Sequence, residues 1–287
     1  MRTADRQRPA PGELFLDHVS HFVPDLDAAA ALLQRLGFAV TPRSEQQVGG
    51  EPVGAANRCV MLEEGYLEIL APTLDTPAAR RMRERIGRFV GVHLACFGTP
   101  DAGGEHARLA AHGFEPQPLV DLQREVGEGS GKRVRFKVVR PAPEKMPEGR
   151  IQYVQQLTPE AIWTDANLAH DNGVTALKSV FVVAEDPIQT AARWARFTGL
   201  LPRRENDWIS LQANRGRVVI ASREHLSPLF ENPPPAPALA GYALACRDPD
   251  EFAARLSRSG IAARKTGARY AVALPAALGG AWLLEPA

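Results

Sequence analysis

The chain has 287 residues, a length that corresponds to about two domains at roughly 150 residues each. Its 34 Lys and Arg residues against 33 Asp and Glu residues leave a net charge of +1, and 45% of its residues are apolar. This near-neutral balance excludes a general electrostatic attraction to nucleic acid or to an anionic membrane, so we expect neither as a partner.

The cysteine content and the lengths of the apolar runs indicate in which cellular compartment the protein is expected. The three cysteines are too few and too far apart for a disulfide framework, and their odd number argues against an oxidising compartment. Residues 1–13 are polar, lack the apolar segment of a signal peptide, and are predicted to form a loose tail. No apolar run approaches the roughly 18 residues of a membrane span. We therefore expect a cytoplasmic protein.

Four segments of the chain repeat one pattern. Each has an apolar strand-like run, an Asp or Pro-Asp turn, an Ala-rich stretch with helical periodicity, and a Gly followed by an apolar residue. Asp caps the first turn of a helix, and Gly adopts the left-handed conformation that ends one. The predicted helices run from Asp25 to Gly37, Asp101 to Gly113, Asp186 to Gly199 and Asp248 to Gly260.

Further strand-like runs follow each Gly, so every unit is predicted to be a βαβββ module. These runs cover residues 38–42, 57–62 and 65–70, then 115–120, 132–140 and 150–155, then 208–211 and 217–221, then 270–274 and 281–284. The glycine-rich residues 127–131 are predicted to form a hairpin turn, residues 231–237 a stiff linker, and residues 158–174 the connection between two halves.

The first unit, LDHVSHFVPDLDAAAALLQRLGF followed by GYLEILAP, resembles the vicinal oxygen chelate superfamily of glyoxalases, bleomycin-resistance proteins and extradiol dioxygenases, and its glyoxalase-like branch most of all. The resemblance extends over about residues 14–285, although in the last two units it is mainly architectural. It implies an α+β fold of four βαβββ modules paired into two curled-sheet half-barrels. We therefore predict an N-terminal domain over residues 14–157 and a C-terminal domain over residues 175–287.

The resemblance also implies a divalent metal ion, bound by the first and last strands of the first two modules. His18 and His93 lie on the first strands, Glu68 lies on a last strand, and Gln152 matches the position of a second carboxylate. Two imidazoles and one carboxylate are typical of non-haem Fe(II), and Zn(II), Mn(II) or Ni(II) would also suit them. Buried structural histidines and a salt-bridged Glu68 are the alternative interpretation. The corresponding strands of the last two units offer no such ligands.

The glutamine at position 152 affects which type of reaction is expected. Glutamine cannot accept a proton as a carboxylate does, which disfavours a glyoxalase-type isomerisation and favours lyase or dioxygenase chemistry on a small molecule with vicinal oxygens. Asn57, Tyr66 and Tyr153 are candidates to bind the substrate, and no catalytic residue is assigned. The second hypothesis is a metal-free protein that sequesters a small molecule. Either protein would be a monomer or a homodimer.

Arginines are frequent in the second unit. They are Arg124, Arg133, Arg135, Arg140 and Arg150. Two interpretations stay open for them: binding of an anionic substrate, or solvated faces of strands.

Overall fold

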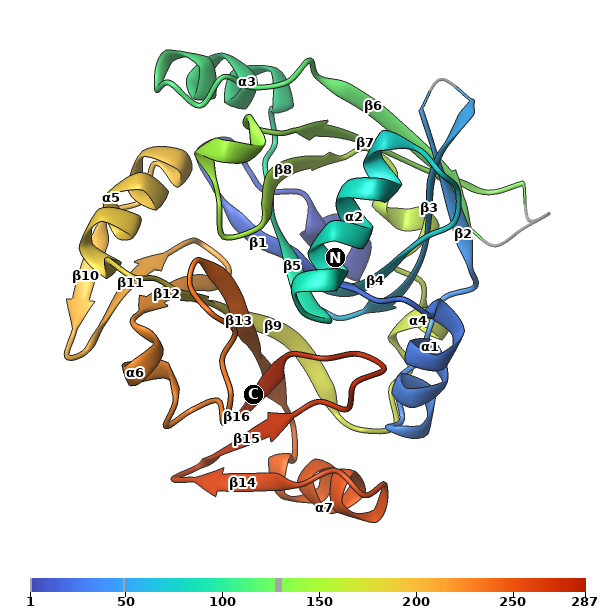
Figure 1. Cartoon of the computed structure of the whole chain (residues 1–287). Coiled ribbons are helices and arrows are strands. Elements are labelled where there is room, and N and C mark those ends of the chain that lie inside the picture. The colour runs from blue at the N-terminus through green and yellow to red at the C-terminus, as the bar shows by residue number, and fades with distance from the viewer. Residues whose placement is uncertain (1, 49, 127–130) are drawn as a thin grey trace.

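The chain folds into two eight-stranded sheets, one closed and one open (Figure 1). The computed structural model describes residues 2–48, 50–126 and 131–287, so residues 127–130 of the predicted glycine-rich turn lie outside the described part. Two βαβββ modules build each sheet, which confirms the predicted α+β fold of four modules.

The first sheet closes into a barrel, with the strand order β1-β4-β3-β2-β6-β7-β8-β5. Its strands are β1 (Phe15–Phe22), β2 (Ser44–Val48), β3 (Glu51–Met61), β4 (Tyr66–Pro72), β5 (Gly91–Gly98), β6 (Val120–Glu125), β7 (Arg133–Val139) and β8 (Arg150–Gln156). The short pairing of β2 with β6, through Gln47 opposite Gln123 and Val48 opposite Leu122, turns the expected half-barrel into a closed one.

The second sheet is open, with the order β10-β11-β12-β9-β13-β16-β15-β14. Its strands are β9 (Val174–Val183), β10 (Pro202–Glu205), β11 (Trp208–Gln212), β12 (Arg217–Ala221), β13 (Ala238–Cys246), β14 (Ala263–Thr266), β15 (Arg269–Ala273) and β16 (Ala281–Pro286). In both sheets the first and last strands of a module run parallel, as β9 and β12 do.

The four repeated helices begin and end as their sequence pattern predicts. They are α1 (Leu26–Arg35), α3 (Ala102–Ala111), α5 (Pro187–Thr198) and α7 (Pro249–Arg258). The Asp before each helix accepts a hydrogen bond from backbone N–H groups of the first turn. The Gly after each helix has a positive φ, which is 84° at Gly37 and 75° at Gly199.

Other helices lie outside the repeat. They are α2 (Pro77–Arg88), α4 (Asp165–Leu168), α6 (Arg223–Leu226) and the 3-10 helices η1 (Thr3–Gln7), η2 (Pro143–Lys145) and η3 (Pro159–Ala161). Helix α2 joins the first two modules over residues for which no element was predicted. Part of the predicted loose tail packs against the barrel, because Gln7 is buried and its Nε2 donates to the carbonyl oxygen of Glu63 at 2.9 Å.

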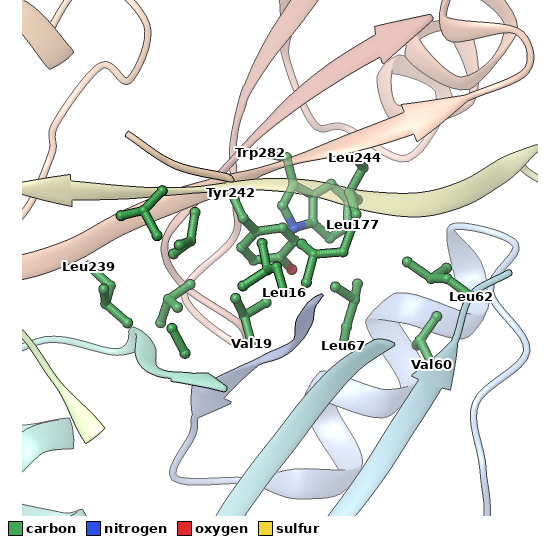
Figure 2. Packing of buried hydrophobic residues seen from close by; sticks show 14 of the residues in the cluster. Leu16, Val19, Val60, Leu62, Leu67, Leu177, Leu239, Tyr242, Leu244 and Trp282 are labelled. Carbon is green, nitrogen blue, oxygen red and sulfur yellow. The ribbon is translucent and has the colours of Figure 1, made fainter. Parts of the chain in front are cut away.

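The two halves share one buried core. Figure 2 shows Leu16, Val19 and Leu67 of the barrel packed against Leu177, Tyr242, Leu244 and Trp282 of the second sheet. The outer face of β1 and β4 is thereby covered by the second half. The opposite face of these strands is directed into the barrel.

Two β-bulges between β1 and β5 decide which side chains face the barrel interior. Asp17 is the extra residue on β1, and His93 is the extra residue on β5. After these bulges, His18 and Ser20 face the interior from β1, and Leu94 does so from β5. Among the described residues no helix is long and apolar enough to cross a membrane.

Candidate active site

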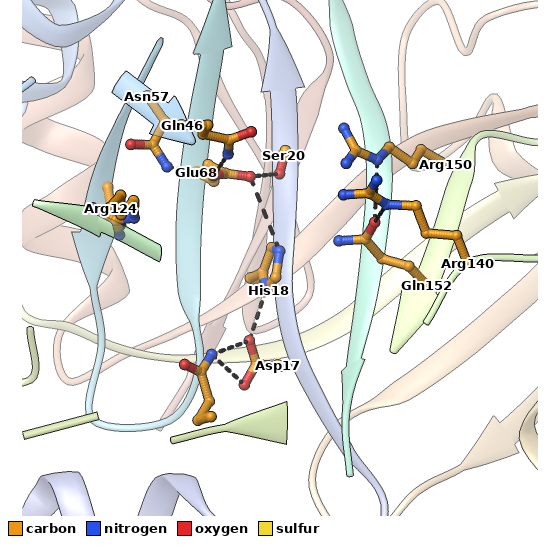
Figure 3. A network of polar contacts seen from close by, with 12 residues as sticks. Asp17, His18, Ser20, Gln46, Asn57, Glu68, Arg124, Arg140, Arg150 and Gln152 are labelled. Carbon is orange, nitrogen blue, oxygen red and sulfur yellow. Dashed lines mark hydrogen bonds and ion pairs between the residues drawn. The ribbon is translucent and has the colours of Figure 1, made fainter. Parts of the chain in front are cut away.

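A polar cluster occupies the interior of the first barrel, in an otherwise apolar environment (Figure 3). It surrounds a cavity of about 20 Å³, which is enough for one water molecule. The polar residues that line this cavity come from five elements of the barrel and from the loop after β7. They are His18, Gln46, Tyr66, Glu68, Arg124, Arg140, Arg150 and Gln152.

Glu68 is the carboxylate at the centre of this cluster. It is buried, and it accepts hydrogen bonds from Ser20 Oγ, from Asn57 Nδ2 at 2.6 Å and from Gln46 Nε2 at 3.4 Å. These donors offset the large cost of removing a carboxylate from water. Asn57 is itself buried, and its Oδ1 atom has no hydrogen-bond partner among the described residues. Asn57 therefore contacts the central carboxylate, and its substrate-binding role stays a prediction.

His18 faces Glu68 from the neighbouring strand. Its Nδ1 donates to Asp17 Oδ1 at 2.6 Å, which leaves Nε2 directed into the cavity, 4.0 Å from Glu68 Oε2. Tyr66 stacks on the imidazole with 4.3 Å between ring centroids. Burial alone would lower the pKa of His18, but the nearby Cys96 sulfur and the Asp17 carboxylate outweigh it and raise that pKa to about 10.

Gln152 and two arginines form the opposite side of the cavity. Gln152 Oε1 accepts a hydrogen bond from Arg140 Nε and another from Arg150 Nε, both at 3.1 Å. Burial and the charge of Arg150 hold the pKa of Arg140 well below its ordinary value. Among the described residues neither guanidinium forms an ion pair with a carboxylate. This side of the cavity therefore carries positive charge without a partner.

The structure does not bring His93 to this cluster. As the bulge residue of β5, His93 turns away from the cavity, and its Nε2 donates to the Phe89 carbonyl oxygen at 2.7 Å. Its ring stacks on Phe89 with 4.1 Å between centroids, and burial lowers its pKa to about 4. Leu94 takes the inward position that the sequence suggested for a second histidine.

Tyr153 also lies away from the cavity. Its side chain points outward from β8, its hydroxyl donates to the Phe197 carbonyl oxygen at 2.6 Å, and it accepts a hydrogen bond from Arg108 Nη2 at 2.8 Å. Phe197 belongs to α5 of the second half. The contacts of Tyr153 therefore join the two halves, in contrast to the substrate-binding role predicted for it.

We expect Tyr153→Phe to lower the free energy of unfolding by about 0.5–1.5 kcal/mol, because it removes one hydrogen bond from the Phe197 carbonyl while Arg108 Nη2 still donates to that carbonyl. Ligand binding in the barrel should stay unchanged. Tyr270→Phe is the matched control, since the Tyr270 hydroxyl bonds Asp250 at the surface. Urea unfolding gives the free energy of unfolding of both variants. Equally small decreases in the two variants would contradict the structural role of Tyr153.

The donor set does not fit the metal centre that the resemblance implies. His18 and Glu68 are suitable ligands, but Leu94 cannot bind a metal. The two lone pairs of Gln152 Oε1 are both engaged by Arg140 and Arg150. Among the described residues no group of three or more His, Cys, Asp and Glu side chains is placed to hold a metal ion. The guanidinium groups beside the cavity also oppose the binding of a further cation.

A family model described as a glyoxalase-like domain matches residues 16–198, more than half of the chain. The chain belongs to this glyoxalase-like family, within the vicinal oxygen chelate superfamily. A comparison with curated proteins finds no significant match.

Solved structures share the fold of this glyoxalase-like protein at low sequence identity. A hypothetical protein from Staphylococcus aureus has a TM-score of 0.67 and 13% identity, over 96% of this chain and 99% of that one. A mutant 4-hydroxymandelate synthase from Streptomyces coelicolor has a TM-score of 0.60 and 14% identity, over 95% and 92%. A fusion of a xylose isomerase-like TIM barrel with 4-hydroxyphenylpyruvate dioxygenase has a TM-score of 0.58 and 12% identity, over 96% and 49%.

Several residues of the cluster were not predicted. Asp17 directly precedes His18 and Ser20 follows it by two residues in the segment DHVS, and this proximity in sequence was the available signal. Cys96 is buried opposite His18 on β5, and burial raises the pKa of its thiol. Gln46 gives no sequence signal, because its contact with Glu68 depends on the pairing of β2 with β3.

Proposed function

We propose that this glyoxalase-like protein is an enzyme that places one oxygen function of a small molecule in the barrel cavity, whose volume matches a water molecule, and transfers a proton on that molecule without a resident metal. One observation carries the proposal. The carboxylate of Glu68 and the imidazole of His18 share a buried cavity with three guanidinium groups, those of Arg124, Arg140 and Arg150, which form no ion pair with a carboxylate among the described residues. An acid–base pair that faces concentrated positive charge suits a reaction in which negative charge develops on oxygen.

Each group has a chemical role in this proposal. Glu68 accepts a proton from a substrate carbon next to a carbonyl or hydroxyl group. The Nη atoms of Arg140 and Arg150 hold the oxygen on which negative charge then develops. Asp17 positions His18 so that Nε2 faces the same cavity. The substrate class is a 2-hydroxy or 2-oxo acid. In an isomerisation Glu68 returns the proton to the neighbouring carbon, whereas in an elimination from a hydroxy acid His18 Nε2 donates a proton to the departing hydroxyl group, which leaves as water.

Exchange of substrate hydrogen with solvent tests the proposal before any product is known. A panel of 2-hydroxy and 2-oxo acids is incubated with the protein in D₂O, and deuterium at the carbon beside the oxygen function is followed by NMR. We expect enzyme-dependent exchange that Glu68→Gln lowers at least about 100-fold, the scale of general base catalysis. Glu64→Gln, in the turn before β4, is the matched control.

Elemental analysis of the same sample tests whether the protein contains a bound metal ion. We expect no stoichiometric Fe, Zn, Mn or Ni, and exchange that persists after treatment with a chelator. Exchange that a chelator abolishes and one of these ions restores would contradict the metal-free mechanism and favour the predicted metalloenzyme. Ligand binding without exchange would favour the sequestering protein instead.

A further inference from the structure

A second pocket adjoins the barrel cluster at the mouth of the barrel. It has a volume of about 130 Å³ and lies between helix α2 and the segment that leads from β7 to β8. Arg81 and Arg85 of α2 line one side, and Arg140 and Arg150 line the other. Figure 3 shows Arg140 and Arg150 beside Gln152, and these two arginines also line the inner cavity that contains Glu68.

The four guanidinium groups of this mouth pocket have no ion pair with a carboxylate among the described residues. Other arginines of α2 differ, because Arg80 lies 2.7 Å and Arg83 lies 3.9 Å from Asp75. Burial, together with the charges of Arg81 and Arg85, lowers the pKa of Arg150 despite the opposing effect of Glu68. Four unpaired positive charges around one small pocket are unfavourable unless an anion occupies it.

The rest of the pocket lining limits what this anion can be. An apolar wall lies beside the arginines. It is formed by Phe22, Met82, Pro141, Met146 and Ile151. Such a wall suits a carbon skeleton rather than a bare inorganic ion. A cavity of similar size, about 150 Å³, accepts a benzene ring in another protein.

We propose that the mouth pocket binds a doubly charged oxyanion carried on a small apolar skeleton, and that it is the specificity site of this protein. The inference rests on the proposed function, because Arg140 and Arg150 connect the pocket to Glu68. Guanidinium groups bind carboxylate and phosphate oxygens through paired hydrogen bonds, and two pairs of arginines match two negative charges. The carbon next to the anion then lies toward the inner cavity.

Isothermal titration with three probes tests this inference on the full chain in a phosphate-free buffer. Phthalate carries two carboxylates on an aromatic ring, benzoate carries one, and inorganic phosphate carries charge without a skeleton. We expect phthalate to bind at least about tenfold more tightly than benzoate and than phosphate, with an affinity that falls as salt increases. Equal affinities for phthalate and benzoate, or binding of none of the probes, would overturn the inference.

Variants of α2 locate the binding. Combined Arg81→Gln and Arg85→Gln should weaken phthalate binding at least about tenfold. Combined Arg80→Gln and Arg83→Gln, with the same charge change on the same helix but outside the pocket, should stay within about twofold. Thermal unfolding of each variant verifies that the fold is retained. Phthalate binding that the double variant leaves intact would overturn the inference.

Glu68→Gln separates this inference from the proposed function. The variant should keep phthalate binding, because Glu68 does not line the mouth pocket, but lose deuterium exchange. Arginine-dependent binding without any exchange supports the anion site and contradicts the enzyme. Deuterium exchange without arginine-dependent binding of phthalate supports the enzyme and contradicts the anion site.

Discussion

Replacing Trp282 by alanine is expected to lower the free energy of unfolding by about 3–5 kcal/mol, the usual cost of truncating a buried tryptophan. Trp282 lies on β16 and is 0% exposed. Its ring contacts Phe38 of the first half at 5.8 Å between centroids, and Tyr242 and Phe252 of the second half at 6.3 Å. The cavity left by alanine would therefore open between the halves, and both should unfold in one transition at lower denaturant.

Two further tryptophan variants sharpen this test. Trp282→Phe keeps most of the buried ring and removes an Nε1 that has no partner among the described residues, so it should recover much of the loss. Trp208→Ala, at a half-buried position of β11, should cost clearly less. Two separate transitions, or equal losses for Trp282→Ala and Trp208→Ala, would contradict a shared core.

The helical framework could be predicted because its signals are local. An Asp cap, an apolar stripe and a closing Gly lie within 12 or 13 residues, and none depends on the rest of the fold. The four caps at Asp25, Asp101, Asp186 and Asp248 accept their hydrogen bonds as this pattern requires. Helix α2 carries the same kind of signal, with Thr76 as its cap and Pro77 in its first turn, but it lies outside the repeat.

Strand orientation was harder to predict, because one extra residue reverses it. The histidine of GVHLAC precedes the inward position by a single residue, and the bulge at His93 is set by the pairing of β5 with β1. His18 lies just after the corresponding bulge at Asp17 and does face the interior. Alternation along one strand cannot reveal such a shift.

The charges of the site also depend on distant parts of the chain. Arg140 and Arg150 meet at Gln152 because a loop folds back between β7 and β8. Arg81 and Arg85 join them only after α2 packs over the barrel mouth. The sequence left both interpretations of the arginines open, and the structure separates them: Arg140 and Arg150 line the cavity, whereas Arg133 is exposed.

The stability of the folded chain is expected to fall between about pH 6.5 and pH 4 through His21, which lies where the halves meet. Its Nδ1 is 3.0 Å from the Leu278 carbonyl oxygen, and its Nε2 is 2.8 Å from the Tyr242 hydroxyl. Burial, with a smaller contribution from the charge of His93, lowers the pKa of His21 to about 4 from an ordinary value of 6.5.

The sign follows from proton binding by the two states. Above pH 6.5 the imidazole is neutral in the folded and the unfolded chain, and it contributes no pH dependence. As the pH falls below 6.5, the unfolded chain binds a proton that the folded chain excludes until about pH 4. Stability therefore decreases over this window, by roughly 3 kcal/mol at 1.36 kcal/mol per pKa unit.

His21→Gln should remove this part of the pH dependence. An amide can still meet Tyr242 and the Leu278 carbonyl, but it does not titrate. Urea unfolding at pH 7 and at pH 4 should show that the free-energy difference between the original chain and the variant shifts by roughly 3 kcal/mol in favour of the variant at the lower pH. His112→Gln, at an exposed position after α3, should leave the pH profile nearly unchanged. Because His93 also titrates with a pKa of about 4, some acid sensitivity should persist in His21→Gln, and parallel profiles for that variant and the original chain would show that His21 is not the titrating group.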